Sequence, residues 1–484
     1  MTLKEAISAL IHYAIHKHLM KENDTPRAKL MLCTLFKIEN FTMDSNPVIH
    51  FDAFMKTLLD EANALGLFEP NILSERDAYE AKLMDMVMPS PKTVKKIFLK
   101  KLLKNSVSAT DYLYQLCKDV NYIKTKRLEE NISWMYKSDY GNLQMTINLA
   151  KPEKDPKEIA LALEKPIKKE KNIPLCVLCK ENEQNYHNAR MNLRIVPIML
   201  GGERWHFQYS PYLYYQEHAI VLHDVHRPMK ISSQTFTYLL DFIELFPSYF
   251  IGSNADLPIV GGSILNHDHF QAGKHHFPIE DAEMIQSFYH PKVKIEHIKW
   301  PLSTIRLSSV SRNDIQEYST KILEHWKDYD NLELDILSHT GPIPHNTITP
   351  ILRKYKNMYQ MDLVLRNNRT SLEYPDGIFH PHADVHHIKK ENIGLIEAMG
   401  LAILPGRLKY ELEWIEKHHD DPVLPDALKK HTNWIEDLKN KSIDKEMLKN
   451  EVGKKFQRVI EDAGVFKLDQ KGIDAMRAFI SSIV

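Results

Sequence analysis

The hydrophobic positions of the first 140 residues recur with helical spacing. Over residues 3–19 the leucine, isoleucine and alanine side chains fall on one stripe, and polar side chains fall on the opposite side. A stripe with a period of about 3.6 residues is typical of an amphipathic helix. Further on, Ser108 and Asp111 have the spacing of a capping box, which predicts a helix over residues 112–120. We therefore expect residues 1–140 to form a mostly helical region, and we identify no chemistry in it.

The pattern changes to strand-like spacing near residue 141. Apolar and polar residues alternate over 143–149, which is typical of a half-buried β-strand. The Asp155-Pro156 pair predicts the start of a short helix, and the lysine-rich run over 165–171 predicts an exposed linker. Beyond the linker, strand, aromatic and turn residues are more frequent, and helical spacing returns over 407–484.

These changes predict an α+β protein in three parts. We expect the helical region over residues 1–140, a catalytic half over 141–335, and a second half over 336–484 that ends in helices. The histidine pair at His267 and His269 has an echo at His380 and His382, which favours two related halves.

Composition and charge exclude several classes of protein. The 484 residues carry a formal net charge of −1, so no global field favours nucleic acid or an anionic membrane. No apolar run reaches the roughly 18 residues of a membrane-spanning helix, and the N-terminus lacks the pattern of a signal peptide. We therefore expect a cytoplasmic protein without nucleic-acid or membrane partners. An anionic substrate would have to be bound by local basic groups.

The stretch from Gly261 to Gln271 carries the strongest candidate chemistry. In an extended backbone, His267, His269 and Gln271 would point to one face, with about 7 Å between neighbours. The Gly261-Gly262 pair permits a ligand to approach the backbone closely. The arrangement would hold a phosphate beside a nucleophilic imidazole. The alternative is a chance pair, because the chain has 25 histidines.

A Cys-x-x-Cys pair indicates a metal site. Cys176 and Cys179 have the spacing with which two thiolates bind one tetrahedral zinc ion. His226, which follows an apolar strand, and His267 are the candidates for the other two ligands. The alternatives are a redox dithiol and a pair of buried thiols without metal.

Arginine and asparagine side chains between residues 190 and 204 favour a phosphate or nucleotide site. The candidates are Arg190, Asn192, Arg194 and Arg204. Arginine can pair with phosphate oxygens through two parallel hydrogen bonds, which is why this residue type points to an anionic ligand. The alternative for each arginine is a surface ion pair.

The C-terminal half contains further candidate residues. His345, His380 and His382 could bind a second metal ion. The alternative is that they are polar strand residues at a turn. Glu397, in a helix expected over residues 391–400, could contact sugar hydroxyls.

The motifs in this order resemble those of the galactose-1-phosphate uridylyltransferase family of the histidine-triad superfamily. The chain length and the helical N-terminal extension look like the second, bacterial type of that family. The resemblance implies histidine-triad-like antiparallel sheets with flanking helices, in two related halves, beside the helical N-terminal region. The residues that carry it are Cys176 and Cys179, His226-Arg227-Pro228, the strand from His267 to Gln271, and His380-Pro381-His382.

The resemblance implies roles for particular residues. His269 would attack UDP-glucose, form a uridylyl-histidine and pass the uridylyl group to galactose 1-phosphate. Gln271 would donate its amide N–H to a phosphate oxygen, and Ser263 and Asn266 would contact the substrate. Zinc would be bound by Cys176, Cys179, His226 and His267, and Glu280 or Glu283 would complete the second metal site.

The sequence departs from the family at one position and leaves two other functions open. Asp268 stands where the first type of the family has proline between the two histidines. A nucleotide phosphorylase of the same superfamily would use phosphate as the acceptor. A non-enzymatic, zinc-organised binding module would form no covalent intermediate. The sequence also leaves a homodimer open.

Overall fold

The computed structural model describes most of the chain. The described residues are 1–69, 72–149, 174–186, 189–421, 423–439, 441 and 443–483. The short helix expected at Asp155 and the linker expected over 165–171 lie outside these ranges. Among the described residues, no helix combines the length and the apolar content that a bilayer crossing requires.

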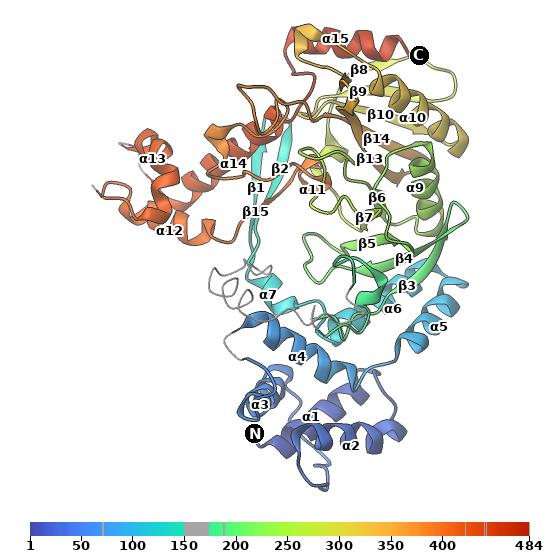
Figure 1. The fold of residues 1–484 in the computed structure, drawn as a ribbon, viewed down its shortest axis with the longest axis vertical. Helices are drawn as coiled ribbons and strands as arrows, with labels where there is room; N and C mark the ends of the chain where they lie inside the picture. The colour runs from blue at the N-terminus through green and yellow to red at the C-terminus, as the bar shows by residue number, and fades with distance from the viewer. Residues whose placement is uncertain are drawn as a thin grey trace.

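The N-terminal region is helical, as expected, and its first four helices lie at one end of the molecule (Figure 1). The first helix begins at Thr2, whose hydroxyl accepts from the Glu5 N–H in a capping box, and buries the predicted apolar stripe. The helices are α1 Leu3–His16, α2 Thr25–Phe36, α3 Phe51–Ala64, α4 Leu73–Asp85, α5 Pro91–Leu102, α6 Ser106–Asp119 and α7 Thr125–Glu129.

The capping box predicted at Ser108 is wrong, because α6 begins earlier. The side chain of Asn105 accepts hydrogen bonds from the backbone N–H groups of Val107, at 2.8 Å, and Ser108, at 3.2 Å. Asparagine is among the best N-cap residues, so it fixes the start of the helix and places Ser108 inside the first turn.

A ten-stranded antiparallel sheet forms the centre of the molecule, in the order β3-β4-β5-β7-β6-β13-β14-β10-β9-β8. The first five strands and their helix are β3 Val196–Leu200, β4 Glu203–Tyr209, β5 Ala219–His223, α9 Ser233–Leu245, β6 Phe250–Gly252 and β7 His269–Gly273. The second five are β8 Met284–Phe288, β9 Lys294–Ile298, β10 Thr304–Ser309, β13 Asn346–Tyr355 and β14 Met358–Asn367, with α10 Arg312–Lys327 after β10.

The two halves of this sheet repeat one topology. Each half has three sequential strands, then a helix, then a strand pair whose later member lies beside the third strand. The halves join where β6 and β13 pair antiparallel, with Ile251 opposite Leu352. The expectation of two related halves is met by this repeat. The first half ends with β7 at Gly273 and the second begins with β8 at Met284, whereas the sequence predicted a boundary at residue 335.

Helices α9 and α10 cover one face of the sheet (Figure 1). Apolar side chains on that face form the main core, and one of them is Phe270 in β7. The Phe270 ring stacks on Trp205, with centroids 4.8 Å apart, and lies 6.2 Å from the Tyr238 ring of α9. Residues next to Phe270 in β7 must therefore point to the opposite face.

A second, three-stranded sheet joins the early and late parts of the chain. Strand β2 pairs antiparallel with β1 and parallel with β15. The strand expected over 143–149 is present as β2, although it begins at Gly141 and ends at Ile147. The strands are β1 Ile132–Ser138, β2 Gly141–Ile147 and β15 Leu401–Leu404, and a short hairpin is formed by β11 His339–Thr340 and β12 Ile343–Pro344.

The C-terminal part is helical, as expected, and α12, α13 and α14 lie beside the three-stranded sheet (Figure 1). The helix expected over 391–400 is only four residues long, from Leu395 to Ala398. Gly394 before it has an extended backbone, and Gly400 after it has φ +96°, which is not helical. The helices are α11 Leu395–Ala398, α12 Leu408–His418, α13 Thr432–Leu438, α14 Lys445–Asp462 and α15 Gln470–Ser481.

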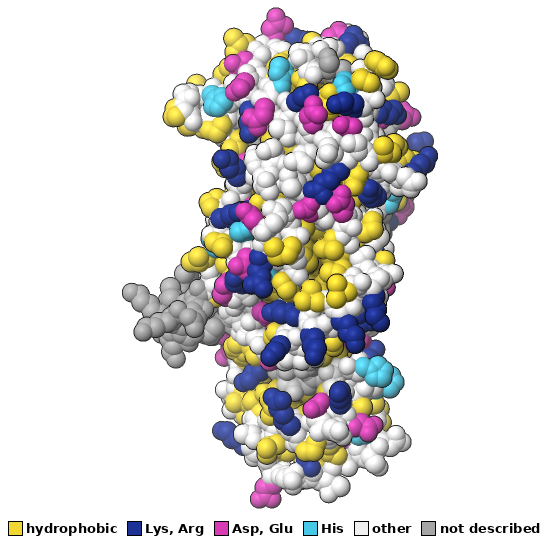
Figure 2. Space-filling model, turned by 90° about the vertical axis from the view of Figure 1, so that its right-hand side faces the viewer, with side chains coloured by type: hydrophobic (Ala, Val, Ile, Leu, Met, Phe, Trp, Pro, Cys, Tyr) yellow, Lys and Arg dark blue, Asp and Glu magenta, His cyan; other side chains and the backbone are white. Residues whose placement is uncertain are grey.

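The surface mixes charges of both signs, in keeping with the net charge of −1. Figure 2 shows acidic, basic and apolar side chains interspersed over one face, with basic ones gathered in a band below its middle. Some basic side chains are paired, such as Lys95 with Glu183 at 2.6 Å. Such partly exposed pairs contribute little to stability.

Candidate active site and metal centre

Strand β7 carries the candidate nucleophile at its first residue. His269 and Gln271 alternate with Phe270, which faces α9, so both point to the opposite face of the sheet. His267 lies just before the strand. The expected alternation of side chains therefore holds for His269 and Gln271. The backbone carbonyl of Asp268 accepts a hydrogen bond from the N–H of His223, the last residue of β5, at 2.9 Å.

The ring of His269 is held in one tautomer. Its Nδ1 lies 2.8 Å from the backbone carbonyl of His267, which can only accept, so Nδ1 carries the proton. Burial lowers the pKa of His269 to about 4, with the His267 carbonyl opposing the shift. The ring is therefore neutral near pH 7, and Nε2 keeps its lone pair. A neutral imidazole with a free Nε2 can act as a nucleophile.

The four predicted zinc ligands lie together. Their candidate ligand atoms are all within 4.8 Å of one another. Cys176 Sγ is 3.6 Å from Cys179 Sγ and 3.3 Å from His267 Nδ1, and Cys179 Sγ is 3.2 Å from His226 Nδ1. Two thiolates on a tetrahedral zinc ion are about 3.8 Å apart, because each Zn–S bond is about 2.3 Å. The donor set and its spacing fit zinc.

The orientation of His267 also fits a metal ligand. Its Nε2 lies 3.0 Å from the carbonyl of His223, so Nε2 donates and Nδ1 is free to face the thiols. The carbonyl of this same residue accepts the proton of His269 Nδ1. His267 therefore belongs to the candidate metal site and also orients the candidate nucleophile.

Asp268 stands where the first type of the family has proline, and its side chain forms an ion pair with Arg227. Its carboxylate lies 3.0 Å from Nη2 of Arg227, and Nη1 of the same arginine lies 3.1 Å from the Glu203 carboxylate. Burial raises the pKa of Asp268, and Arg227 opposes that shift. Because Arg227 follows His226 and Asp268 follows His267, the pair ties together the two segments that supply the histidine ligands.

Asn192 and Arg194, two residues of the predicted phosphate cradle, are buried and hydrogen-bonded inside the protein. Arg194 is 1% exposed, and its guanidinium pairs with Asp85 of α4 at 2.6 Å. Asn192 donates to the carbonyl of Val120 at 2.9 Å. The loop that carries them packs against the N-terminal helices, so these polar groups satisfy helix carbonyls and carboxylates. Arg190 makes a contact of the same kind, with the Tyr122 hydroxyl at 2.5 Å.

Of the other candidate substrate residues, three are exposed and Glu397 is buried. Arg204, Ser263 and Asn266 are exposed, so substrate contacts by them remain predictions. Glu397 is buried and pairs with Lys389 at 3.0 Å. Burial, with a smaller contribution from Glu397, raises the pKa of Tyr214 to about 12.

The second metal site is not assembled. Among the described residues, the Cys176 group is the one set of histidine, cysteine and acidic side chains that could hold an ion. The ring nitrogens of the three C-terminal histidines make hydrogen bonds with other groups of the protein. The partners are Asn368 and Thr340 for His345, Asn392 and the Pro381 carbonyl for His380, and the Ile378 carbonyl for His382. Glu280, a candidate ligand, lies 3.4 Å from Arg353.

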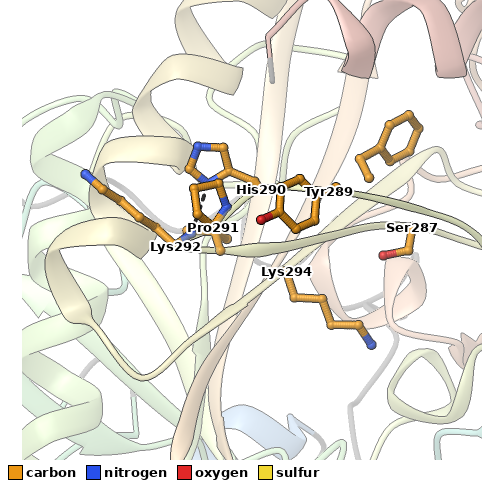
Figure 3. Close-up of a pocket in the computed structure, with 8 residues that line it drawn as sticks. Ser287, Tyr289, His290, Pro291, Lys292 and Lys294 are labelled. Carbon is orange, nitrogen blue, oxygen red and sulfur yellow. Dashed lines mark hydrogen bonds between the residues drawn. The ribbon is translucent and has the colours of Figure 1, made fainter.

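Sequence reasoning missed His218, which lies next to Gln271. His218 is the residue just before β5, and its Nε2 lies 3.1 Å from Oε1 of Gln271 in the paired strand β7. It belongs to no motif with a recognisable spacing, and only the sheet pairing brings it to this position. A shallow pocket elsewhere, at the β8–β9 hairpin, is lined by residues 287–294 and contains none of these groups (Figure 3).

The fold and the site define an α+β protein of two related halves, in which a neutral imidazole lies beside a Cys2His2 group. Sequence models for the N-terminal and C-terminal domains of galactose-1-phosphate uridyl transferase match residues 49–228 and 242–435. The chain belongs to the galactose-1-phosphate uridylyltransferase family.

Full-length relatives agree with this assignment. Galactose-1-phosphate uridylyltransferase of Caldanaerobacter subterraneus is 47% identical, over 100% of this chain and 99% of the relative. The protein of that name from Clostridium acetobutylicum is 44% identical, over 99% of each chain. Yeast Ap4A phosphorylase Apa2 is 13% identical, with a TM-score of 0.35, over 63% of this chain and 90% of that structure.

Proposed function

We propose that this protein moves UMP from UDP-glucose to galactose 1-phosphate, which gives UDP-galactose and glucose 1-phosphate. The observation that carries the proposal is the neutral ring of His269, whose Nδ1–H donates to the His267 carbonyl at 2.8 Å and leaves Nε2 free. Membership of the family, and the full-length relatives that carry this enzyme name, support the choice of substrates.

Two displacements at one phosphorus atom account for the reaction. His269 Nε2 attacks the α-phosphorus of UDP-glucose, an N–P bond forms, and the P–O bond to glucose 1-phosphate breaks. The leaving group is a phosphate ester, which departs without needing a proton. A phosphate oxygen of galactose 1-phosphate then attacks the same phosphorus, and the N–P bond breaks. The His267 carbonyl stabilises the positive charge that the ring carries between the two steps.

Gln271 favours transfer over hydrolysis. Its amide N–H can donate to a non-bridging phosphate oxygen in both displacements. A neutral amide neither protonates a leaving group nor removes a proton from water. A sugar phosphate, which is already ionised, is therefore a better acceptor at this site than water.

The Cys2His2 group would hold zinc in a structural role. With four protein ligands, a zinc ion has no open position for water, so it would connect the three segments that supply Cys176, Cys179, His226 and His267. We also infer a cytoplasmic location, which the paired thiols support because thiolate ligands persist in reducing compartments.

The test is the intact mass of the protein after mixing with UDP-glucose alone. We expect the wild type to gain one uridylyl group per chain and to lose it when galactose 1-phosphate is added. His269→Ala should gain nothing, because it lacks the nucleophile. The control His418→Asn changes an exposed histidine of α12 and should behave as wild type.

Two results would contradict the proposal. Absence of both the adduct and free glucose 1-phosphate in the wild type would reject the transferase function. Discharge of the adduct by inorganic phosphate, with no response to galactose 1-phosphate, would instead assign a nucleotide phosphorylase.

A further inference from the structure

Gln208 is a buried glutamine of β4 whose amide oxygen has no hydrogen-bond partner. The residue is 2% exposed, and no group of the described residues donates to its Oε1. The ring of the neighbouring Phe207 stacks on Phe242 of α9, with centroids 6.3 Å apart. Gln208 therefore points to the opposite face of the sheet, which is also the face of Gln271. A buried oxygen without a partner costs free energy, and a ligand can offset that cost.

Gln208 lies in register with Gln271 across strand β5. Ile220 of β5 is opposite Gln208 on one side and opposite Gln271 on the other, so the three side chains form a row on one face. Neighbouring strands are about 4.8 Å apart, so the backbones of the two glutamines are roughly 10 Å apart. A nucleoside monophosphate has a similar length from its phosphorus atom to the far edge of its base.

The face of the sheet is accessible on the Gln208 side of Gln271 and covered on the other side. Ile220 and Gln271 are partly exposed, although both lie in central strands of the sheet. On the other side, Gly252 of β6 is opposite Gln271, and a Cβ at Gly252 would meet Leu395 Cδ1 at 2.8 Å. A flat ring that is attached to a phosphate at Gln271 can therefore lie over Ile220, with its edge toward Gln208.

We propose that Gln208 binds the uracil ring of the transferred UMP group, with Oε1 accepting from the ring N3–H and the amide N–H donating to the adjacent ring carbonyl. The inference rests on the proposed function, which puts the phosphate beside His269 and Gln271. A carboxamide and the edge of uracil are complementary, because each has one donor next to one acceptor. The uridylyl group stays on the enzyme while the hexose phosphates exchange, so a buried contact with the base serves both displacements.

Gln208→Met tests the role, because methionine has nearly the shape of glutamine and can make neither hydrogen bond. Calorimetry measures the binding of UMP, and of ribose 5-phosphate, which lacks the base. We expect UMP to bind the variant on the order of 10- to 100-fold more weakly than wild type, and ribose 5-phosphate to bind both proteins equally. The control Gln234→Met changes an exposed glutamine of α9 and should bind UMP as wild type does.

The melting temperature of Gln208→Met separates a ligand contact from a structural one. In the protein without ligand, the variant no longer buries an amide oxygen that lacks a partner. We therefore expect it to melt at the same temperature as wild type or at a higher one. A glutamine that stabilised the fold through its amide would instead give a variant with a lower melting temperature.

Three results would overturn the role of Gln208. They are a lower melting temperature of Gln208→Met, equal weakening of both ligands in that variant, and wild-type binding of UMP that is no tighter than that of ribose 5-phosphate. If the wild type forms no adduct with UDP-glucose, the proposed function fails. A normal adduct in wild type, together with unchanged UMP binding in Gln208→Met, rejects only the role of Gln208.

Discussion

Asp268 shows how a single residue can replace the proline that the first type of the family has between its two histidines. The Asp268 carboxylate pairs with Arg227, and its backbone N–H donates to the Arg227 carbonyl at 2.7 Å. Proline has no N–H and could make neither contact. In this chain the histidine pair is therefore fixed by contacts with a neighbouring segment.

We expect Asp268→Ala to lower the free energy of unfolding by about 1–3 kcal/mol, because the partly buried guanidinium of Arg227 loses a partner. Asp268→Pro should be less stable than Asp268→Ala, because it also removes the backbone hydrogen bond to the Arg227 carbonyl. Urea unfolding of the zinc-loaded proteins measures both. Equal stability of the two variants would show that the backbone bond contributes nothing.

The buried ring of His218 predicts a dependence of stability on pH. Its pKa is about 4 in the folded protein, whereas histidine in an unfolded chain titrates at about 6.5. As the pH falls, the His218 ring of the unfolded chain takes up a proton before the ring of the folded protein does. The neutral buried ring therefore makes its full contribution to the free energy of unfolding above a pH of about 6.5, and this contribution is lost as the pH falls toward 4. Between pH 7 and 4 we expect wild type to lose up to about 3 kcal/mol relative to His218→Gln. Paired urea titrations at each pH measure this difference, and a difference that stays constant would contradict it.

At the scale of elements, the loop that carries Cys176 and Cys179 leaves Leu175 and Val177 exposed, and its cysteines lie beside His226 and His267. A zinc ion bound by these four residues would hold the loop against the sheet. Since the His267 carbonyl also accepts a hydrogen bond from His269, disorder in this loop would affect the candidate nucleophile.

We expect the purified protein to contain one zinc per chain, and chelation to lower both the melting temperature and the rate of adduct formation. At free zinc 100 times its Kd, bound metal stabilises the folded state by about 2.7 kcal/mol. Cys176→Ser should reduce zinc content, whereas Cys33→Ala, which changes a buried thiol of α2, should not. Full zinc content in Cys176→Ser would reject the assignment of the ligands.

Helices and strands whose pattern lies within a short stretch of sequence could be predicted from that sequence. Contacts between segments that are far apart in the chain could not. The period of residues 3–19 predicted α1, and the alternation after residue 141 predicted β2, because each pattern lies within one element. The cysteine pair of the Cys2His2 group was also predicted, since Cys-x-x-Cys spacing is local. The roles of Asn192 and Arg194 were not, because their partners belong to helices about 70 to 110 residues earlier in the chain.

At the scale of the molecule, the two halves have the same strand order but different chemistry. Strand β14 occupies in the second half the place that β7 has in the first, and Met358–Asn367 contains no histidine. The similar histidine pairs at His267 and His380 therefore do not occupy equivalent positions in the two halves, because His380 lies beyond β14. In place of a nucleophile, the second half has a buried ion network, in which Asp362 pairs with Arg306 at 2.7 Å and Arg353 at 2.6 Å.

The parallel pairing of β2 with β15 has a consequence for synthesis on the ribosome. Residues 141–147 emerge early, but their partner over 401–404 emerges after most of the chain has been made. At about 5–20 residues per second, the apolar edge of β2 waits on the order of ten seconds or more. During that interval the nascent chain exposes a strand edge that can pair with other chains. A chain that ends before Leu401 never covers this edge, so premature termination would give an aggregating product even though the candidate catalytic residues are complete.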